Sequence, residues 1–224
     1  MAGKSMAENY KKCLRYRQIL IIIALAGVAG QFGAFDGYFS IYMLNYFTVL
    51  SNIAVIAYFI ADVRWMKKDG GESAAWTVYR PLLKSCITAW ILVTFTVALF
   101  VLRMKFDFTS GVGVSFLAVH FIVPAMTIAD WYMYDKKGII RGSWPVKWYL
   151  GLAAYAVYAI STARLREDSD FGSAYIYPFL DVDQNGWSSV ILMAAGLTGG
   201  FFLLSYLFIL LDTRIAQKEE QRQS

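Results

Sequence analysis

Cysteine and histidine are scarce in this chain, whose 224 residues include two cysteines and one histidine. Cys13 and Cys86 cannot build a framework of disulfides, and they do not form the CxxC pair typical of a metal site. A single histidine also excludes the HExxH pattern of zinc hydrolases. The sequence therefore predicts neither a metal site nor a cofactor.

Charge is sparse as well. Charged residues make up 17% of the chain and gather in short clusters, whereas hydrophobic residues make up 58%. A soluble domain is about 45–50% apolar, so this excess indicates a surface that faces lipid. The net charge of +5 comes from basic residues beside apolar runs, which is typical of membrane orientation rather than phosphate binding. We expect membrane lipids as neighbours and no nucleic acid as partner.

Six apolar segments are long enough to cross a bilayer, whose core of about 30 Å needs about 20 helical residues. They cover residues 17–36, 41–63, 82–102, 112–134, 146–163 and 189–211. The predicted fold class is all-α: a polytopic membrane protein with a single domain, 1–224, of six transmembrane helices in one bundle. The long connection 164–188 is predicted to be an outer loop.

Basic residues mark the cytoplasmic side of a membrane protein. With six spans, seventeen lysines and arginines fall on one side, and four, Arg103, Lys105, Arg164 and Arg166, fall on the other. This asymmetry predicts that both termini are cytoplasmic. Because no eukaryotic targeting signal is visible, we expect a multi-pass protein of a bacterial cell inner membrane.

Two pairs of glycines have the GxxxG spacing that lets membrane helices approach closely. Gly33 and Gly37 form one pair, predicted in the first span, and Gly196 and Gly200 form the other, in the last span. The alternative is that these glycines have no packing role, since glycine is common in membrane helices.

An ionisable residue inside the membrane is a candidate functional residue, because it is expensive to bury in lipid. His120, the only histidine, lies well inside the fourth predicted span. A neutral imidazole can accept a proton near neutral pH. The alternative is a histidine that only bonds a neighbouring helix.

Three polar residues of the second predicted span, Thr48, Ser51 and Asn52, share one helix face. Most threonines in membrane helices bond the carbonyl four residues earlier and do nothing more. However, Thr48 and His120 are about seven and eight residues into spans that both enter from outside, so both lie about 10–12 Å deep. If the two helices are neighbours, they predict a nucleophile–base pair.

Other charged residues near the spans are predicted to be structural. Asp62, Arg64, Asp130 and Asp212 lie within about two turns of helix ends, where charges reach headgroups or pair. The segment from Asp181 to Gly186 spells half of a calcium loop, but its twelfth position is Leu192 instead of glutamate, so we interpret it as a turn.

The chain resembles the androgen-induced-like family of membrane threonine hydrolases, and its compact microbial members above all. The resemblance rests on YFTVLSN around Thr48, on HFIVPAMTIADW from His120 onward and on YPFLDVDQNGW from Tyr177 to Trp187. Family members cleave fatty-acid esters of hydroxy fatty acids inside the membrane. The resemblance implies that Thr48 is the nucleophile and His120 the histidine of the site. In the third motif Tyr177, Asp181 and Trp187 are expected to support the site, as a cap from outside.

The sequence thus predicts a lipid-ester hydrolase acting in the outer half of the bilayer on a lipid or fatty-acyl ester. Ser51 and Asn52 would support the pair, and Asn52 or a backbone N–H would stabilise the oxyanion. The alternative function is a non-enzymatic lipid-binding membrane protein or a small transporter. Transport is disfavoured because no charged residue is predicted near the middle of a span.

Overall fold

The structure is a computed structural model that describes residues 2–102, 107–165 and 174–223. Every regular element among these residues is a helix, in agreement with the predicted all-α fold. Met1–Ile140 together with Asp212–Ser224 forms one compact unit, and Arg141–Leu211 forms a second. Part of the predicted outer loop, 166–173, lies outside the described residues. The single domain, 1–224, stays a prediction.

Among its described residues, the first unit contains α1 to α5, the end of α7 (Val182–Gln223), and several short turns of π- or 3-10 helix. The first five α-helices are α1 (Ala2–Gln31), α2 (Phe47–Trp65), α3 (Pro81–Thr96), α4 (Gly111–Leu117) and α5 (Val123–Tyr134). The turns are 3-10 helices at Ile41–Asn45 and Gly71–Trp76, and π-helices at Met66–Gly70, Val97–Val101 and Ala118–Ile122 (η5). Because η5 joins α4 directly to α5, these three elements form one continuous helical segment.

The second unit contains α6 (Trp144–Ser161), most of α7 (Val182–Gln223), and short 3-10 turns at Ala163–Leu165 and Pro178–Leu180. Gly186 has a φ of 72°, so α7 is kinked there. Within this unit the Tyr149 and Thr198 hydroxyls lie 2.8 Å apart and join α6 to α7.

Five helical segments among the described residues are long and apolar enough to span a membrane. They are Met6–Gln31, Phe47–Ser73, Pro81–Val101, Gly111–Tyr134 and Val182–Arg222. The chain is therefore a multi-pass membrane protein. The predicted span 146–163 is not one of the five. It corresponds to α6, whose apolar character is reduced by Lys147 and several tyrosines, and the sixth span stays a prediction.

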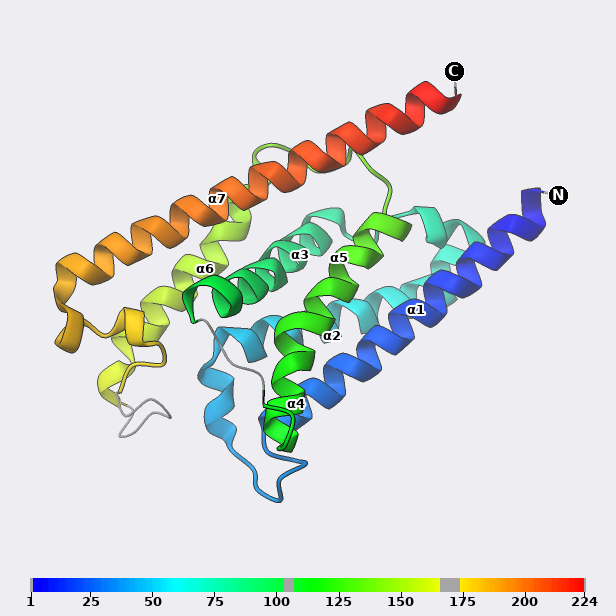
Figure 1. Ribbon diagram of the computed structural model, residues 1–224. Helices are drawn as coiled ribbons and strands as arrows, with labels where there is room; N and C mark the ends of the chain where they lie inside the picture. Colours follow the sequence, from blue (N-terminus) through cyan, green and yellow to red (C-terminus); the bar gives the residue numbers. More distant parts are fainter. Residues whose placement is uncertain (1, 103–106, 166–173, 224) are drawn as a thin grey trace. The chain divides into compact units, whose positions relative to one another are not determined.

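Helices α1, α2, α3 and α5 form the bundle that carries the candidate site (Figure 1). Helix α1 contacts α2 and α5, and α3 contacts the same two helices from the other side. Buried side chains from all parts of this ring, among them Leu20, Val55, Ile91 and Val123, form its core. Burying apolar area in this way fixes the relative position of α2 and α5.

Glycines bring α1 close to the segment that carries His120. A Cβ atom on Gly27 would lie 3.0 Å from Val119 Cγ1, and one on Gly30 would overlap Ser115. The predicted packing pair Gly33 and Gly37 is wrong in its location, because both residues follow the end of α1. They have φ values of 87° and 77°, which favour glycine in a turn.

Candidate functional site

Thr48 lies in the first turn of α2, closer to the helix start than the sequence predicts. The predicted span began at residue 41, but Ile41–Asn45 is a separate 3-10 helix and Tyr46 has extended backbone dihedrals. Helix α2 therefore begins at Phe47. The predicted depth of seven residues is corrected to the second residue of the helix, where backbone amides have no acceptor within the helix.

His120 lies in the π-turn η5, and Pro124 follows two residues after the end of this turn. The Val123 N–H bonds the carbonyl of Ala118 across this turn. Pro124 has no N–H, so it cannot bond the carbonyls that a regular helix would offer it. π-turns of this kind are frequent at functional sites, because they change the direction of one side chain within a helix.

The structure brings Thr48 and His120 together. Thr48 Oγ1 lies 3.0 Å from His120 Nε2, and the two side chains are buried, with 9% and 5% of their surface exposed. His120 Nδ1 lies 3.1 Å from the carbonyl oxygen of Phe116. A carbonyl only accepts, so in the neutral ring Nδ1 carries the proton and Nε2 offers its lone pair to the Thr48 hydroxyl.

The ring of His120 is held on two sides. Besides the bond to the Phe116 carbonyl, it stacks on the Phe116 ring with 3.9 Å between centroids. The Phe116 carbonyl thus takes the orienting position that a carboxylate has in a Ser-His-Asp triad. Thr48 and His120 form a hydroxyl–imidazole pair whose tautomer suits proton transfer from oxygen to nitrogen.

Asn52 connects the two helices that carry this pair. Its side-chain amide donates to the Thr48 carbonyl at 2.8 Å and to the Val119 carbonyl at 3.0 Å. The Val119 carbonyl needs this donor, since the residue five positions later is Pro124. Because both amide hydrogens are used, Asn52 is a positioning residue, which leaves the backbone N–H groups as candidate oxyanion donors.

Ser51 ties the same turn to α3. Its hydroxyl lies 3.0 Å from the Thr48 carbonyl and 2.8 Å from the hydroxyl of Thr94. Ser51, Asn52 and Thr94 are all buried. The predicted polar face of α2 therefore exists, and it bonds neighbouring helices around Thr48. Thr94 was missed because it lies in an apolar run with no local signal.

The third predicted motif belongs to the second unit. Tyr177 and Asp181 are buried there, and Trp187 is exposed. Asp181 Oδ1 accepts the backbone N–H groups of Asp183 and Gln184, so it caps the start of α7. The interpretation of this segment as a turn into the last span agrees with that geometry, while a supporting role at the site stays a prediction.

A second polar cluster was not predicted. Asp62 and Asp130, expected near headgroups or in pairs, are both fully buried and paired with Arg17, a residue of the predicted cytoplasmic side. Lys84 is also buried and pairs with Asp130. Arg17 and Lys84 lie near other basic residues at the ends of predicted spans, so no local signal distinguishes them from residues that only set the orientation.

Comparisons with known proteins add no family to this description. No protein-family model matches the chain, and no curated protein or solved structure matches it either.

Proposed function

We propose that this protein is an intramembrane lipid-ester hydrolase with Thr48 as nucleophile and His120 as general base. The proposal includes the six-span arrangement with both termini in the cytoplasm of a bacterial cell, and the resemblance to the androgen-induced-like membrane threonine hydrolases. No cofactor takes part in it. The single observation that carries it is the 3.0 Å contact from the Thr48 hydroxyl to His120 Nε2.

The contact supports catalysis because the Thr48 hydroxyl donates its hydrogen bond to the imidazole of His120. An ordinary buried threonine satisfies its hydroxyl on the carbonyl four residues earlier, as Thr88 and Thr127 do here. Thr48 has an imidazole nitrogen in reach instead, and that nitrogen is the acceptor because Nδ1 is bonded to Phe116. A hydroxyl with an oriented base beside it meets the geometric requirement for nucleophilic catalysis.

In the first half-reaction the Thr48 oxygen attacks the ester carbonyl while its proton passes to His120 Nε2. The tetrahedral oxyanion is stabilised by first-turn amides of α2, such as those of Thr48 and Val49, at the positive end of the helix dipole. Collapse breaks the ester C–O bond, and the leaving alkoxide takes the proton from His120. The products are an alcohol and an acyl-threonine.

In the second half-reaction a water molecule gives its proton to His120 Nε2 and attacks the acyl-threonine carbonyl. The second oxyanion collapses by breaking the bond to the Thr48 oxygen, which recovers the proton from His120. The free fatty acid leaves and the side chains return to their starting state. Asn52 and Ser51 keep Thr48 against η5 throughout, and Phe116 keeps the imidazole in one tautomer.

The surroundings of the pair support a fatty-acyl ester as the substrate class. Their chain neighbours Val49 and Val119 belong to the apolar core of the bundle, and in the proposal the ester reaches the pair from the lipid. In the proposed six-span arrangement this end of α2 faces the outer half of the bilayer. Tyr177, Asp181 and Trp187 keep the supporting role that the resemblance implies.

The test is hydrolysis of a fatty-acid ester of a hydroxy fatty acid by the purified protein in lipid vesicles. Thr48→Ala should lower turnover by at least about 1,000-fold, because no other group replaces the nucleophile. Thr88→Ala is the matched control, since Thr88 is equally buried and bonds only its own helix, and it should retain turnover. Equal turnover in the Thr48→Ala protein would exclude the assignment.

A small transporter is the second candidate, and one observation favours it. Arg17, Lys84, Asp62 and Asp130 are buried within candidate spans, and such charges often mark ion pathways. A parent protein with no ester turnover that moves a solute across vesicle membranes would favour this function over hydrolysis.

A further inference from the structure

Buried charges of the first unit do not balance. Among the residues that the structure describes in this unit, seven charged side chains are buried. The cations are Arg17, Lys84 and Lys137, and the carboxyl groups are Asp62, Asp130, Asp135 and Asp212. With all seven ionised, the set carries one excess negative charge. An uncompensated charge in a low-dielectric interior is neutralised by taking up or losing a proton.

Arg17 is the centre of this cluster. Its Nη1 lies 2.6 Å from Asp62 Oδ2, its Nε 2.9 Å from Asp130 Oδ1, and its Nη2 3.3 Å from Asp135 Oδ1. Lys84 adds a short contact to Asp130 and a longer one, 3.8 Å, to Asp135. Asp130 therefore has two cations on its two oxygens, which keeps it ionised.

Asp212 has a hydrogen-bond donor on each of its two oxygens. Its Oδ1 accepts the Trp131 indole N–H at 3.2 Å, and its Oδ2 accepts the backbone N–H of Gly138 at 2.8 Å. The carboxyl groups whose oxygens have fewer or longer bonds, and which can therefore take the balancing proton, are Asp62 and Asp135.

The contacts of Asp62 and Asp135 leave room for a proton on a carboxyl oxygen. Asp62 Oδ1 is buried and has no hydrogen-bond partner among the described residues, so only one of its oxygens is stabilised. Asp135 has its bond to Arg17 at 3.3 Å, the longer end of the range. Burial raises the pKa of Asp135 to about 6.

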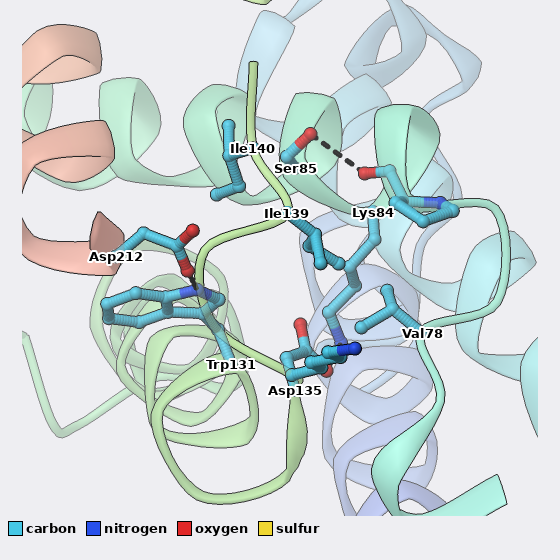
Figure 2. A pocket seen from close by; sticks show the side chains of 10 residues that line it. Val78, Lys84, Ser85, Trp131, Asp135, Ile139, Ile140 and Asp212 are labelled. Atoms are coloured by element: carbon cyan, nitrogen blue, oxygen red, sulfur yellow. Dashed lines mark hydrogen bonds and ion pairs between the residues drawn. The ribbon is translucent and has the colours of Figure 1, made fainter. Parts of the chain in front are cut away.

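A pocket lies beside this cluster (Figure 2). Lys84, Asp135 and the exposed Lys136 form part of its wall. Its volume of about 10 Å³ is about the smallest that holds one water molecule. A water molecule bound there would give a proton a route between the Asp135 carboxyl group and the solvent.

We propose that the cluster is a proton-binding site. One exchangeable proton is held by the carboxyl groups of Asp62 and Asp135, each of which accepts from one terminal nitrogen of Arg17, and it exchanges through the pocket beside Lys84. The site is separate from Thr48 and His120 and does not depend on the proposed hydrolysis. It binds a proton with a carboxyl pair and gives the protein a charge that changes with pH at this end of the bundle.

Other titratable or charged groups around the cluster come from every element packed on it. They are Cys13 and Tyr16 of α1, Tyr58 of α2, Tyr134 of α5, Lys136 of the following loop and Glu219 of α7. The tyrosines and the cysteine are neutral near neutral pH, so the shared carboxyl pair is the group that changes charge there.

The direct test is infrared spectroscopy of the purified protein across pH, which detects the carbonyl stretch of a protonated carboxylic acid. The parent should show one such band that disappears as pH rises. Asp62→Asn and Asp135→Asn should each lack the band, because either change balances the charges and leaves the other carboxyl ionised. Asp69→Asn, in an exposed turn, should retain it.

Thermal unfolding across pH is the second measurement. For Asp135, with its raised pKa, the folded state binds more protons than the unfolded state between about pH 4 and about pH 6, so stability falls as pH rises through this window. The Asp135→Asn protein should lose this slope. Subtracting its pH profile of stability from that of the parent cancels the contributions of all other titratable groups, His120 included. At about pH 8, where the parent carries the excess charge, Asp62→Asn and Asp135→Asn should be at least as stable as the parent.

An Asn side chain imitates the protonated carboxyl, since its carbonyl accepts from Arg17 and its NH₂ takes the place of the O–H. Ordinary ion pairs would give the opposite result, a large loss of stability in both variants at every pH. That outcome, or an infrared band that survives in either variant, would overturn the proposal.

Discussion

The two ends of α2 contact neighbouring helices through different kinds of side chain. At the start of the helix a neutral hydroxyl meets a neutral imidazole, Thr48 with His120, and at its other end Asp62 meets the guanidinium of Arg17. Fourteen residues separate Thr48 from Asp62, which is about 21 Å along the helix. One bundle therefore keeps a group that can react apart from groups that hold charge.

The two ends of α2 are also stabilised in different ways. Around Thr48, the Val119 carbonyl that the π-turn and Pro124 leave unbonded accepts from the neutral Asn52 amide. Around Arg17, burial of the guanidinium is compensated mainly by the carboxylates of Asp62 and Asp130. Loss of one neutral partner should therefore cost less stability than loss of one cation.

The largest expected effect on stability belongs to the charged end. Arg17→Met leaves Asp62 and Asp130 without their shared cation, and breaking a buried ion pair costs about 3–5 kcal/mol. The free energy of unfolding, measured with denaturant in detergent micelles, should fall by this amount. The exposed Arg64 is the matched control, and Arg64→Met should change it by less than about 0.5 kcal/mol. Equal effects of the two variants would contradict the difference between the ends.

These two ends also differ in how well the sequence predicted them. The Thr48–His120 pair could be predicted from the sequence because a lone histidine in an apolar run stands out and the polar face Thr48, Ser51 and Asn52 follows helical spacing. The cluster around Arg17 could not be predicted, because basic residues at predicted span ends indicate orientation and say nothing of partners on other helices.

Helix boundaries explain the remaining differences. The first turn of α2 was misplaced because Ile41–Asn45 is apolar like the span, so composition alone does not reveal the break before Phe47. The close approach of Gly27 to η5 and of Gly30 to α4 was missed because the GxxxG spacing directed attention to Gly33 and Gly37, which lie in a turn.

A smaller effect is expected at the neutral end. Asn52→Ala removes the donor to the Val119 carbonyl, and an unsatisfied buried carbonyl costs about 1–3 kcal/mol. The free energy of unfolding should fall by this amount, and ester turnover should fall because α2 and η5 are no longer joined beside the pair. Asn185→Ala is the control, since the exposed Asn185 amide also donates to two carbonyls, those of Pro178 and Asp181. A variant as active and stable as the parent would show that Asn52 does not position Thr48.

The central claim is that the imidazole of His120 activates the Thr48 hydroxyl, and the most direct test is to find where a fluorophosphonate lipid probe attaches. Mass spectrometry of the labelled protein should place the adduct on Thr48, and labelling should be slowed about 100-fold or more in the His120→Gln protein. An adduct on another hydroxyl, such as that of Ser51, or an unchanged labelling rate in the His120→Gln protein, would contradict the claim.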